Sequence, residues 1–559
     1  MRICSALIAL ALAGVAGAAS ARGMRAPTDP VAQFAIGTAA MARSDLGEAT
    51  RRYDAALAAD PSNVTLRRAA FGMALMTGDR HRVDALAAQL SPGEGQDSVL
   101  LLLRLVQAFE RRDWRAASAV ADSVQTQKLF GEALPAAIRA WAKFDGGDRA
   151  GALTMLKPEG AAPGAFSAIA EQRARMLVAA GRYAEARTAF AGLLLGGERG
   201  VDLRIAAADA AARMGYRAAA HDLLVETEPS GALERARTRL EAGHAIQDEG
   251  NPARAGLAAL MGALIGELGQ RQPVAAIPFA RIAAFMAPRR GVETLRLADM
   301  LNRASQYEAA LATAASVPEG SLWAGEATGL RAQVLMRRED QTAALALLRR
   351  AAEGKRGGAF EWSQLGGAEM QAKAFAPAAQ SYTRAIELAQ AKGPVAWPLW
   401  FQRGSAYEQA KDWPHAEADL RRALALSPRE PIVLNYLGYS LIDRGLKMDE
   451  GTKLVQQALA GAPNDPAILD SLGWAYYHGA RYADAVGPLE RAVAGAPGDA
   501  AVIEHLGDAY WKVGRRLEAR FQWNAAATLD PDTDEKARLA AKIDYGLDRA
   551  VLAGAMPAA

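Results

Sequence analysis

The stretch LDSLGWAYYHGARYADAVGPLERAVAGAP, residues 469–497, returns in the same pattern as IEHLGDAYWKVGRRLEARFQWNAAATLDP, residues 503–531. Each stretch has Leu-Gly near its start, then aromatic and alanine residues, and a proline at its end. A glycine marks this unit four times, at intervals of 34, 35 and 34 residues: Gly404, Gly438, Gly473 and Gly507. An alanine and a proline follow each glycine at nearly fixed distances: Ala423, Ala458, Ala492 and Ala526, then Pro428, Pro463, Pro497 and Pro531. A fixed period of this length indicates a repeat architecture.

The residue types at each place explain the period physically. Small residues at the eighth, twentieth and twenty-seventh places let two helices touch, where a larger side chain would cost roughly 1–3 kcal/mol by overpacking. Large residues between them fill the space between helices, and the proline ends the second helix. In these places the sequence resembles the tetratricopeptide repeat (TPR) family. The resemblance implies an all-α fold, a right-handed α-solenoid (TPR superhelix) of about fourteen helix pairs.

The period continues towards the N-terminus with weaker signals. Gly37 and Tyr53 belong to one clear unit, but the phase slips between about residues 208 and 264. We therefore divide the chain into a signal peptide at 1–21, N-terminal TPR-like repeats at 30–232, an irregular helical segment at 233–290, C-terminal TPR repeats at 291–533, and a capping helix with a tail at 534–559.

Composition favours an array of helices over a sheet. Hydrophobic residues make up 51% of the 559 residues and aromatic residues only 6%, because alanine, the best helix former, dominates. The 65 basic and 62 acidic residues leave a net charge of +3. This near balance provides no electrostatic footprint for nucleic acid, so we expect protein partners and no nucleic acid.

The N-terminus has the features of a secretory signal peptide. Arg2 precedes an apolar run, and the small residues Ala19, Ser20 and Ala21 predict cleavage after Ala21. The single cysteine, Cys4, precedes the run and would leave with the peptide, so thiol chemistry is not expected. Since no other segment approaches the length of a transmembrane helix, we expect a periplasmic protein without a transmembrane segment, and association with the outer membrane stays open.

No motif typical of an enzyme is present. The sequence lacks HExxH, GxSxG and Walker A patterns, and the basic loop GKRGG at 354–358 lacks the strand and the Ser or Thr of a phosphate-binding loop. His478 and His505 belong to neighbouring repeats and could approach each other, but ordinary polar surface is favoured over a zinc site. We predict no catalytic residues, no metal and no cofactor.

The resemblance implies a ligand surface on the first helix of each repeat, where places 2, 5, 9, 12 and 13 line the concave face. In the last repeats these places concentrate aromatic and acidic side chains, which are typical of binding hot spots. The predicted partner-binding surface consists of Asn435, Tyr439, Asp443, Asp470, Trp474, Tyr477, His478, Glu504, Asp508, Trp511 and Lys512. The alternative is that the rings pack between repeats. If they wait for a partner instead, Trp474→Ala should change the folding free energy by no more than about 1 kcal/mol.

From Phe401 to Trp523 the motifs look most similar to large proteobacterial envelope TPR proteins. That group includes lipoprotein adaptors of carboxyl-terminal processing proteases, so the resemblance implies a scaffold that holds a protease and its cell-wall hydrolase substrates. This sequence departs from the adaptors because it lacks a cysteine placed for lipidation. One alternative is a structural component of envelope polymer export or outer-membrane assembly. Another is a repeat-fused enzyme, which the absence of a catalytic domain disfavours.

Overall fold

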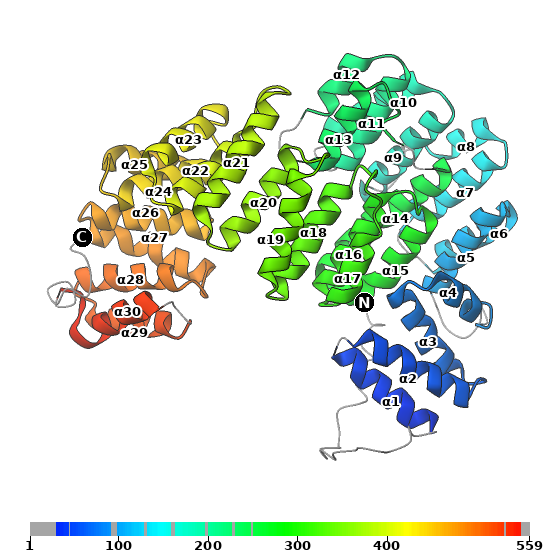
Figure 1. Cartoon of the computed structure of the whole chain (residues 1–559), viewed down its shortest axis with the longest axis horizontal. Helices are drawn as coiled ribbons and strands as arrows, with labels where there is room; N and C mark the ends of the chain where they lie inside the picture. Colours follow the sequence, from blue (N-terminus) through cyan, green and yellow to red (C-terminus); the bar gives the residue numbers. More distant parts are fainter. Residues whose placement is uncertain are drawn as a thin grey trace.

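A computed structural model describes residues 29–548, apart from residue 44 and the segments 91–97, 128–130, 158–162, 196–199, 226–229, 248–249 and 530–532. Within these ranges the regular structure consists of thirty α-helices. Twenty-eight of them form fourteen pairs of consecutive, packed helices, and α13 and α30 stand outside the pairs. The fold is the predicted α-solenoid (Figure 1). The expected signal peptide, Cys4 and Pro531 lie outside the described residues.

The first array contains six helix pairs, α1 to α12. Its helices are α1 (Pro30–Ala42), α2 (Leu46–Ala59), α3 (Val64–Thr77), α4 (Arg80–Ala87), α5 (Ser98–Arg111), α6 (Trp114–Thr126), α7 (Ala133–Asp145), α8 (Arg149–Met155), α9 (Pro163–Ala179), α10 (Tyr183–Leu195), α11 (Val201–Arg213) and α12 (Arg217–Leu223). Successive pairs pack on each other at most junctions, and α4 is joined to α5 by hydrogen bonds from Arg80 to Glu110 and from Gln107 to Asp84, so the core extends along the array in the manner of a repeat protein.

The second array contains seven pairs and ends with the single helix α30. Its helices are α16 (Gly291–Arg303), α17 (Tyr307–Ala315), α18 (Ala324–Arg337), α19 (Gln341–Glu353), α20 (Ala359–Gln371), α21 (Phe375–Gln390), α22 (Trp397–Gln409), α23 (Trp413–Leu426), α24 (Pro431–Asp443), α25 (Met448–Gly461), α26 (Pro466–His478), α27 (Tyr482–Gly495), α28 (Ala500–Lys512), α29 (Arg516–Ala527) and α30 (Thr533–Tyr545). The capping role predicted for the last helix corresponds to α30, which packs on α29.

Small residues lie at the helix contacts, as the sequence pattern predicts. A side-chain carbon added to Gly473 would lie 2.4 Å from Cγ of Leu489 on the paired helix. Ala492 is fully buried and packs with Leu469 and Val502. These contacts leave no room for a larger side chain, which is why the glycine and alanine places recur.

The turn inside most helix pairs repeats one backbone conformation. A residue in the left-handed region recurs there, and it is often not glycine: Gly78, Arg112, Gly147, Gly181, Gly215, Ser305, Glu339, Lys373, Lys411, Gly445, Ala480 and Gly514. In several pairs the next residue is an aspartate whose side chain accepts a hydrogen bond from the first turn of the second helix, as Asp79, Asp113 and Asp340 do. The period therefore continues in the backbone where the residue types have drifted.

The segment predicted as irregular, 233–290, contains most of α13 (Gly231–Glu241), all of α14 (Pro252–Arg271) and all of α15 (Pro273–Met286). Helix α14 packs on α7 and α9, and α15 packs on α3 and α5 (Figure 1). Arg281 of α15 is only 9% exposed and donates hydrogen bonds of 2.9 and 3.0 Å to the carbonyl oxygens of Leu75 and Met76 in α3. These first helices of the N-terminal pairs are therefore covered by helices of the same chain.

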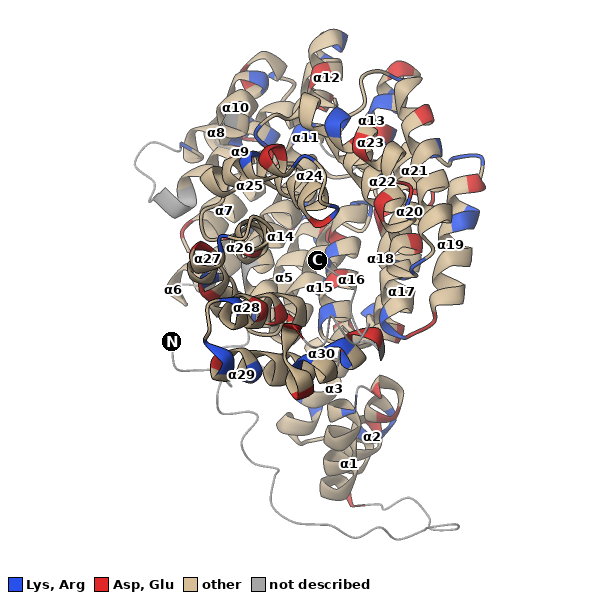
Figure 2. Cartoon of the chain, turned by 90° about the vertical axis from the view of Figure 1, so that its left-hand side faces the viewer, with Lys and Arg blue, Asp and Glu red and all other residues tan. Residues whose placement is uncertain are grey.

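Helix α13 connects the two arrays by packing on α11 of the first and on α18 and α20 of the second. A second connection is the buried Arg290, which donates hydrogen bonds of 2.9 and 2.8 Å to the carboxylate of Asp202 on α11. Acidic and basic residues are interspersed over both arrays (Figure 2). Across the described residues, every helix is too short or too polar to span a lipid bilayer.

Candidate partner-binding surface

Three neighbouring helices carry the eleven predicted binding residues. Helix α26 packs directly on both α24 and α28, so side chains at equivalent places of the three helices lie next to one another. Spacings of three and four residues put the predicted side chains of each helix on one side of it. The structure then divides the set in two: the residues of α24 and α26, and those of α28.

Trp474 lies in the centre of a stack of rings. Its indole is parallel to the ring of Tyr477, with centroids 4.9 Å apart and an interplanar angle of 4°. On α28 the imidazole of His505 stacks on it at 3.8 Å, and His478 meets it edge-on at 4.8 Å. Trp474 thus packs between two repeats, as the alternative interpretation of the sequence held.

His505 is a site residue that the sequence analysis considered only as a metal ligand. Its ring Nδ1 hydrogen-bonds both carboxylate oxygens of Asp470, at 2.9 and 3.1 Å. Burial alone would lower the pKa of His505, but the carboxylates of Asp470, Asp508 and Glu504 outweigh it and raise that pKa. Asp470 therefore orients the imidazole against Trp474. No group of three or more His, Cys, Asp or Glu side chains suited to a metal ion occurs in the described part of the chain.

Three of the predicted residues on α24 and α26 carry a buried polar atom that has no hydrogen-bond partner among the described residues: Asn435 Oδ1, Trp474 Nε1 and His478 Nε2. Leaving such an atom unpaired costs roughly 1–3 kcal/mol. Burial also lowers the pKa of His478, which favours the neutral ring. One acceptor, one indole donor and one imidazole nitrogen are thus unsatisfied on adjacent helices.

Two further residues complete this set. Tyr439 is partly buried, and burial together with the nearby carboxylates of Asp443 and Asp470 raises the pKa of its phenol. Asp443 at the end of α24 is exposed. We call Asn435, Tyr439, Asp443, Asp470, Trp474, Tyr477 and His478 the α24–α26 surface.

The four predicted residues of α28 contact the C-terminal segment of the same chain. Lys542 of α30, only 2% exposed, donates hydrogen bonds to Glu504 at 2.6 Å and to Asp508 at 2.6 and 2.8 Å. Burial would raise the pKa of Glu504, but bonds from Arg538 and the charge of Lys542 lower it to about 2.

Trp511 and Lys512 also have partners within the chain. Trp511 Nε1 and Lys512 Nζ donate to the carboxylate of Asp548, at 3.0 and 2.9 Å. A side-chain carbon on Gly546 would lie 2.3 Å from the Trp511 ring. The sequence analysis predicted a capping helix after the last repeat, but it did not predict that this segment would bond the residues of α28 assigned to the partner surface, because the pattern of α28 does not show which of its side chains the cap covers.

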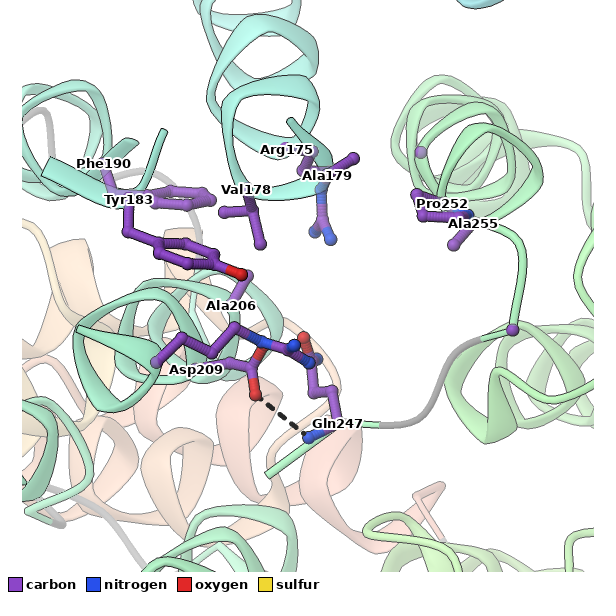
Figure 3. A pocket seen from close by; sticks show the side chains of 13 residues that line it. Arg175, Val178, Ala179, Tyr183, Phe190, Ala206, Asp209, Gln247, Pro252 and Ala255 are labelled. Atoms are coloured by element: carbon purple, nitrogen blue, oxygen red, sulfur yellow. Dashed lines mark hydrogen bonds and ion pairs between the residues drawn. The ribbon is translucent and has the colours of Figure 1, made fainter. Parts of the chain in front are cut away.

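The first array has a cavity of its own, about 270 Å³ in volume, between α9–α11 and the start of α14 (Figure 3). Its charged groups are paired: Arg175 donates to Glu171 and Asp202, and Arg213 donates to Asp209. No polar side chain that lines the cavity has a buried atom left without a partner in the described residues. The α24–α26 surface differs from this cavity because it contains buried polar atoms without a hydrogen-bond partner among the described residues.

Comparison with known proteins agrees with the repeat geometry. A family model described as "Tetratricopeptide repeat" matches residues 397–430, the pair α22–α23. The TPR repeat-containing protein PA4667 of Pseudomonas aeruginosa is 35% identical over 87 residues, which cover 16% of this chain and 15% of that protein. The chain thus aligns with less than a sixth of the length of this curated relative.

Two solved structures are similar over nearly the full length. The Cut9–Hcn1 hetero-tetramer of the APC/C shows 12% identity and a TM-score of 0.41, covering 93% of this chain and 98% of that one. Yeast Tom70 shows 12% identity and a TM-score of 0.37, with 94% and 98% covered. Likeness at this level carries no argument about function. The helix pairs define the class of fold, an α-solenoid, and the family match shows one tetratricopeptide repeat in it, at residues 397–430.

Proposed function

We propose that this chain is a periplasmic scaffold that binds a protein partner through the α24–α26 surface and catalyses no reaction itself. The observation that carries the proposal is the set of unpaired buried atoms on Asn435, Trp474 and His478. These atoms are buried in the unbound chain, so a partner reaches them only when its binding shifts the side chains around them. It would then recover the lost free energy by supplying a donor to Asn435 Oδ1, an acceptor to the Trp474 indole N–H, and to His478 Nε2 a donor or an acceptor according to the tautomer of the ring.

The identity proposed for the partner rests on the sequence resemblance alone. Motifs between Phe401 and Trp523 resemble envelope adaptors, so the proposed partner is a carboxyl-terminal processing protease, with its cell-wall hydrolase substrates brought to it. The proposed location rests on the signal-like N-terminus. Intact mass of protein from the native envelope tests it, since a retained Met1 would argue against secretion through a cleaved signal peptide.

Asn435→Leu is the sharpest test of the surface. Replacing an unpaired buried acceptor with an apolar side chain of similar volume removes a desolvation cost, so the free energy of unfolding should stay unchanged or rise. Partner binding should weaken by about tenfold, which corresponds to about 1.4 kcal/mol. Capture of the protease from periplasmic extract, followed by titration of the purified pair, measures the binding.

Asn524→Leu provides the matched control, because Asn524 is exposed on the second helix α29 and bonds only its own helix. Unchanged partner affinity in Asn435→Leu would remove the α24–α26 surface from the binding site.

A further inference from the structure

A cavity of the second array lies beside the joint with α13. It has a volume of about 710 Å³ and is enclosed by α13, α17, α18, α19, the start of α20 and the loop at 354–358. Neither the repeat pattern nor the proposed partner surface accounts for it. The basic loop GKRGG, which sequence analysis left without a role, forms part of its wall.

Charge in this cleft is strongly one-sided. Five basic residues line it, Arg235, Arg331, Arg350, Lys355 and Arg356, against two acidic ones, Glu319 and Glu361. Both acids are already paired with cations of the same set: Arg235 bonds Glu361, and Arg356 lies 3.9 Å from Glu319.

Three cations therefore have nothing to neutralise them. Within the described residues, Arg331, Arg350 and Lys355 make no ion pair or hydrogen bond through their side chains. They come from α18, α19 and the loop that follows α19. Charges of one sign around a hollow raise the local concentration of ligands of opposite sign.

Apolar side chains make up much of the wall between the cations. Val317 and Leu347 are buried residues of the lining, and five alanines add to its apolar part: Ala314, Ala315, Ala324, Ala327 and Ala351. A phosphate ion would use the cations alone, whereas a peptide segment could place carboxylates on the cations and small apolar side chains on the alanines. The volume also falls in the range of sites that enclose several side chains.

We propose that this cleft binds an acidic segment of a protein partner, with carboxylates at Arg331, Arg350 and Lys355. Guanidinium groups suit this role because they bind carboxylates through two parallel hydrogen bonds. The proposal rests on the proposed scaffold function and adds the chemistry of a second contact. It places that contact on α18 and α19, several repeats away from the α24–α26 surface.

The test uses the full chain and a short labelled peptide of glutamate, alanine and leucine, with binding followed by fluorescence anisotropy. The peptide should bind, and affinity should fall as salt screens the charges. The Arg331→Ala, Arg350→Ala double variant should bind at least tenfold more weakly. Arg337→Ala is the matched control, because Arg337 is an exposed arginine of the same helix α18 that does not line the cleft. Thermal unfolding of each variant checks that the fold is kept.

Equal binding by the double variant and the wild type would overturn the assignment. Competition with inorganic triphosphate is a second check. If triphosphate displaces the labelled peptide at a lower concentration than an unlabelled glutamate peptide does, the cleft is a phosphate site and the assignment is overturned. If the peptide binds as expected but no envelope protein is captured, the scaffold proposal fails and the cleft stands. If the protease is captured but the peptide does not bind, the assignment of the cleft fails and the scaffold proposal stands.

Discussion

Trp474 joins two repeats through a single side chain. Its ring is half-buried and lies between Tyr477 of its own helix and His505 of the next repeat. Trp474→Ala should therefore lower the free energy of unfolding by about 2 kcal/mol or more, because the truncation empties a packed space. This loss is larger than the limit of about 1 kcal/mol that the sequence analysis gave for a tryptophan ring free to bind a partner.

Denaturant unfolding of Trp474→Ala and Trp474→Phe separates packing from hydrogen bonding. Trp474→Phe keeps an aromatic ring between Tyr477 and His505 but lacks the unpaired indole N–H. It should lose less stability than the alanine variant while weakening partner binding. A loss below about 1 kcal/mol in Trp474→Ala would mean that the stack contributes little to folding.

The pair of His505 and Asp470 predicts a pH dependence with a definite sign. The folded state raises the pKa of His505 above its ordinary 6.5, so it binds the proton more tightly than the unfolded chain does. The resulting stabilisation is complete below the unfolded pKa and is lost as pH rises through the raised folded pKa. Asp470→Asn should thus destabilise the protein more at about pH 5.5 than at about pH 9.

Urea unfolding at both pH values measures this difference, with Asp484→Asn as the control. Asp484 forms an exposed ion pair with Arg481 on the turn and first residues of α27, where no histidine takes part. A cost of Asp470→Asn that is the same at both pH values would show that this carboxylate does not stabilise the protonated form of His505.

Helix α30 ends the second array by placing a buried cation against α28. Lys542 lies between Glu504 and Asp508, so Lys542→Ala would leave two buried carboxylates with one partner fewer. Breaking such a buried pair typically costs about 3–5 kcal/mol. Because repeats couple mainly to their neighbours, the loss should concentrate in α28 to α30 and leave α1 and α2 unchanged.

Hydrogen exchange along the chain measures where protection falls in Lys542→Ala. Lys453→Ala on α25 is the control, since Lys453 is exposed and its removal should change nothing. Uniform loss of protection over both arrays would be inconsistent with a solenoid whose last repeats contact mainly their neighbours.

The two halves of the chain have different long-range organisation. In the first half, α14 and α15 cover helices that lie far from them in sequence, and Arg281 bonds Leu75 across 206 residues. Arg281→Ala should therefore raise hydrogen exchange in α3 as well as in α15, and leave α26 to α29 protected. Removing a charged hydrogen bond should cost about 1.5–3 kcal/mol.

Arg303→Ala is the comparison for that experiment. Arg303 forms an exposed pair with Asp299 on the same helix, worth at most about 0.5 kcal/mol. If faster exchange in Arg281→Ala is confined to α15, the contact with α3 does not hold the two helices together.

The helix pairs of the second array could be predicted from sequence because each depends on contacts between neighbours. Gly473 and Ala492 face the paired or adjacent helix within one period, so their size is constrained at regular places along the chain. In weaker repeats the small residues at the helix contacts keep the period, as the buried Ala310 and Ala344 do, but the turn residue changes. Ser305 and Glu339 occupy the left-handed turn where glycine stands in other pairs, so residue type does not mark the turn there.

Which surfaces are covered was decided by tertiary structure. The residues of α28 have the same places as those of α26, yet Glu504 and Asp508 bind Lys542 of the last helix while Trp474 stacks on His505. Helices α14 and α15 likewise pack on α3, α5, α7 and α9, which lie far from them in sequence. A local pattern records which side of a helix is apolar or charged. The local pattern does not record which distant segment packs on that side of the helix. Each repeat adds a small rotation, and the sum of these rotations over the whole array decides which segments meet.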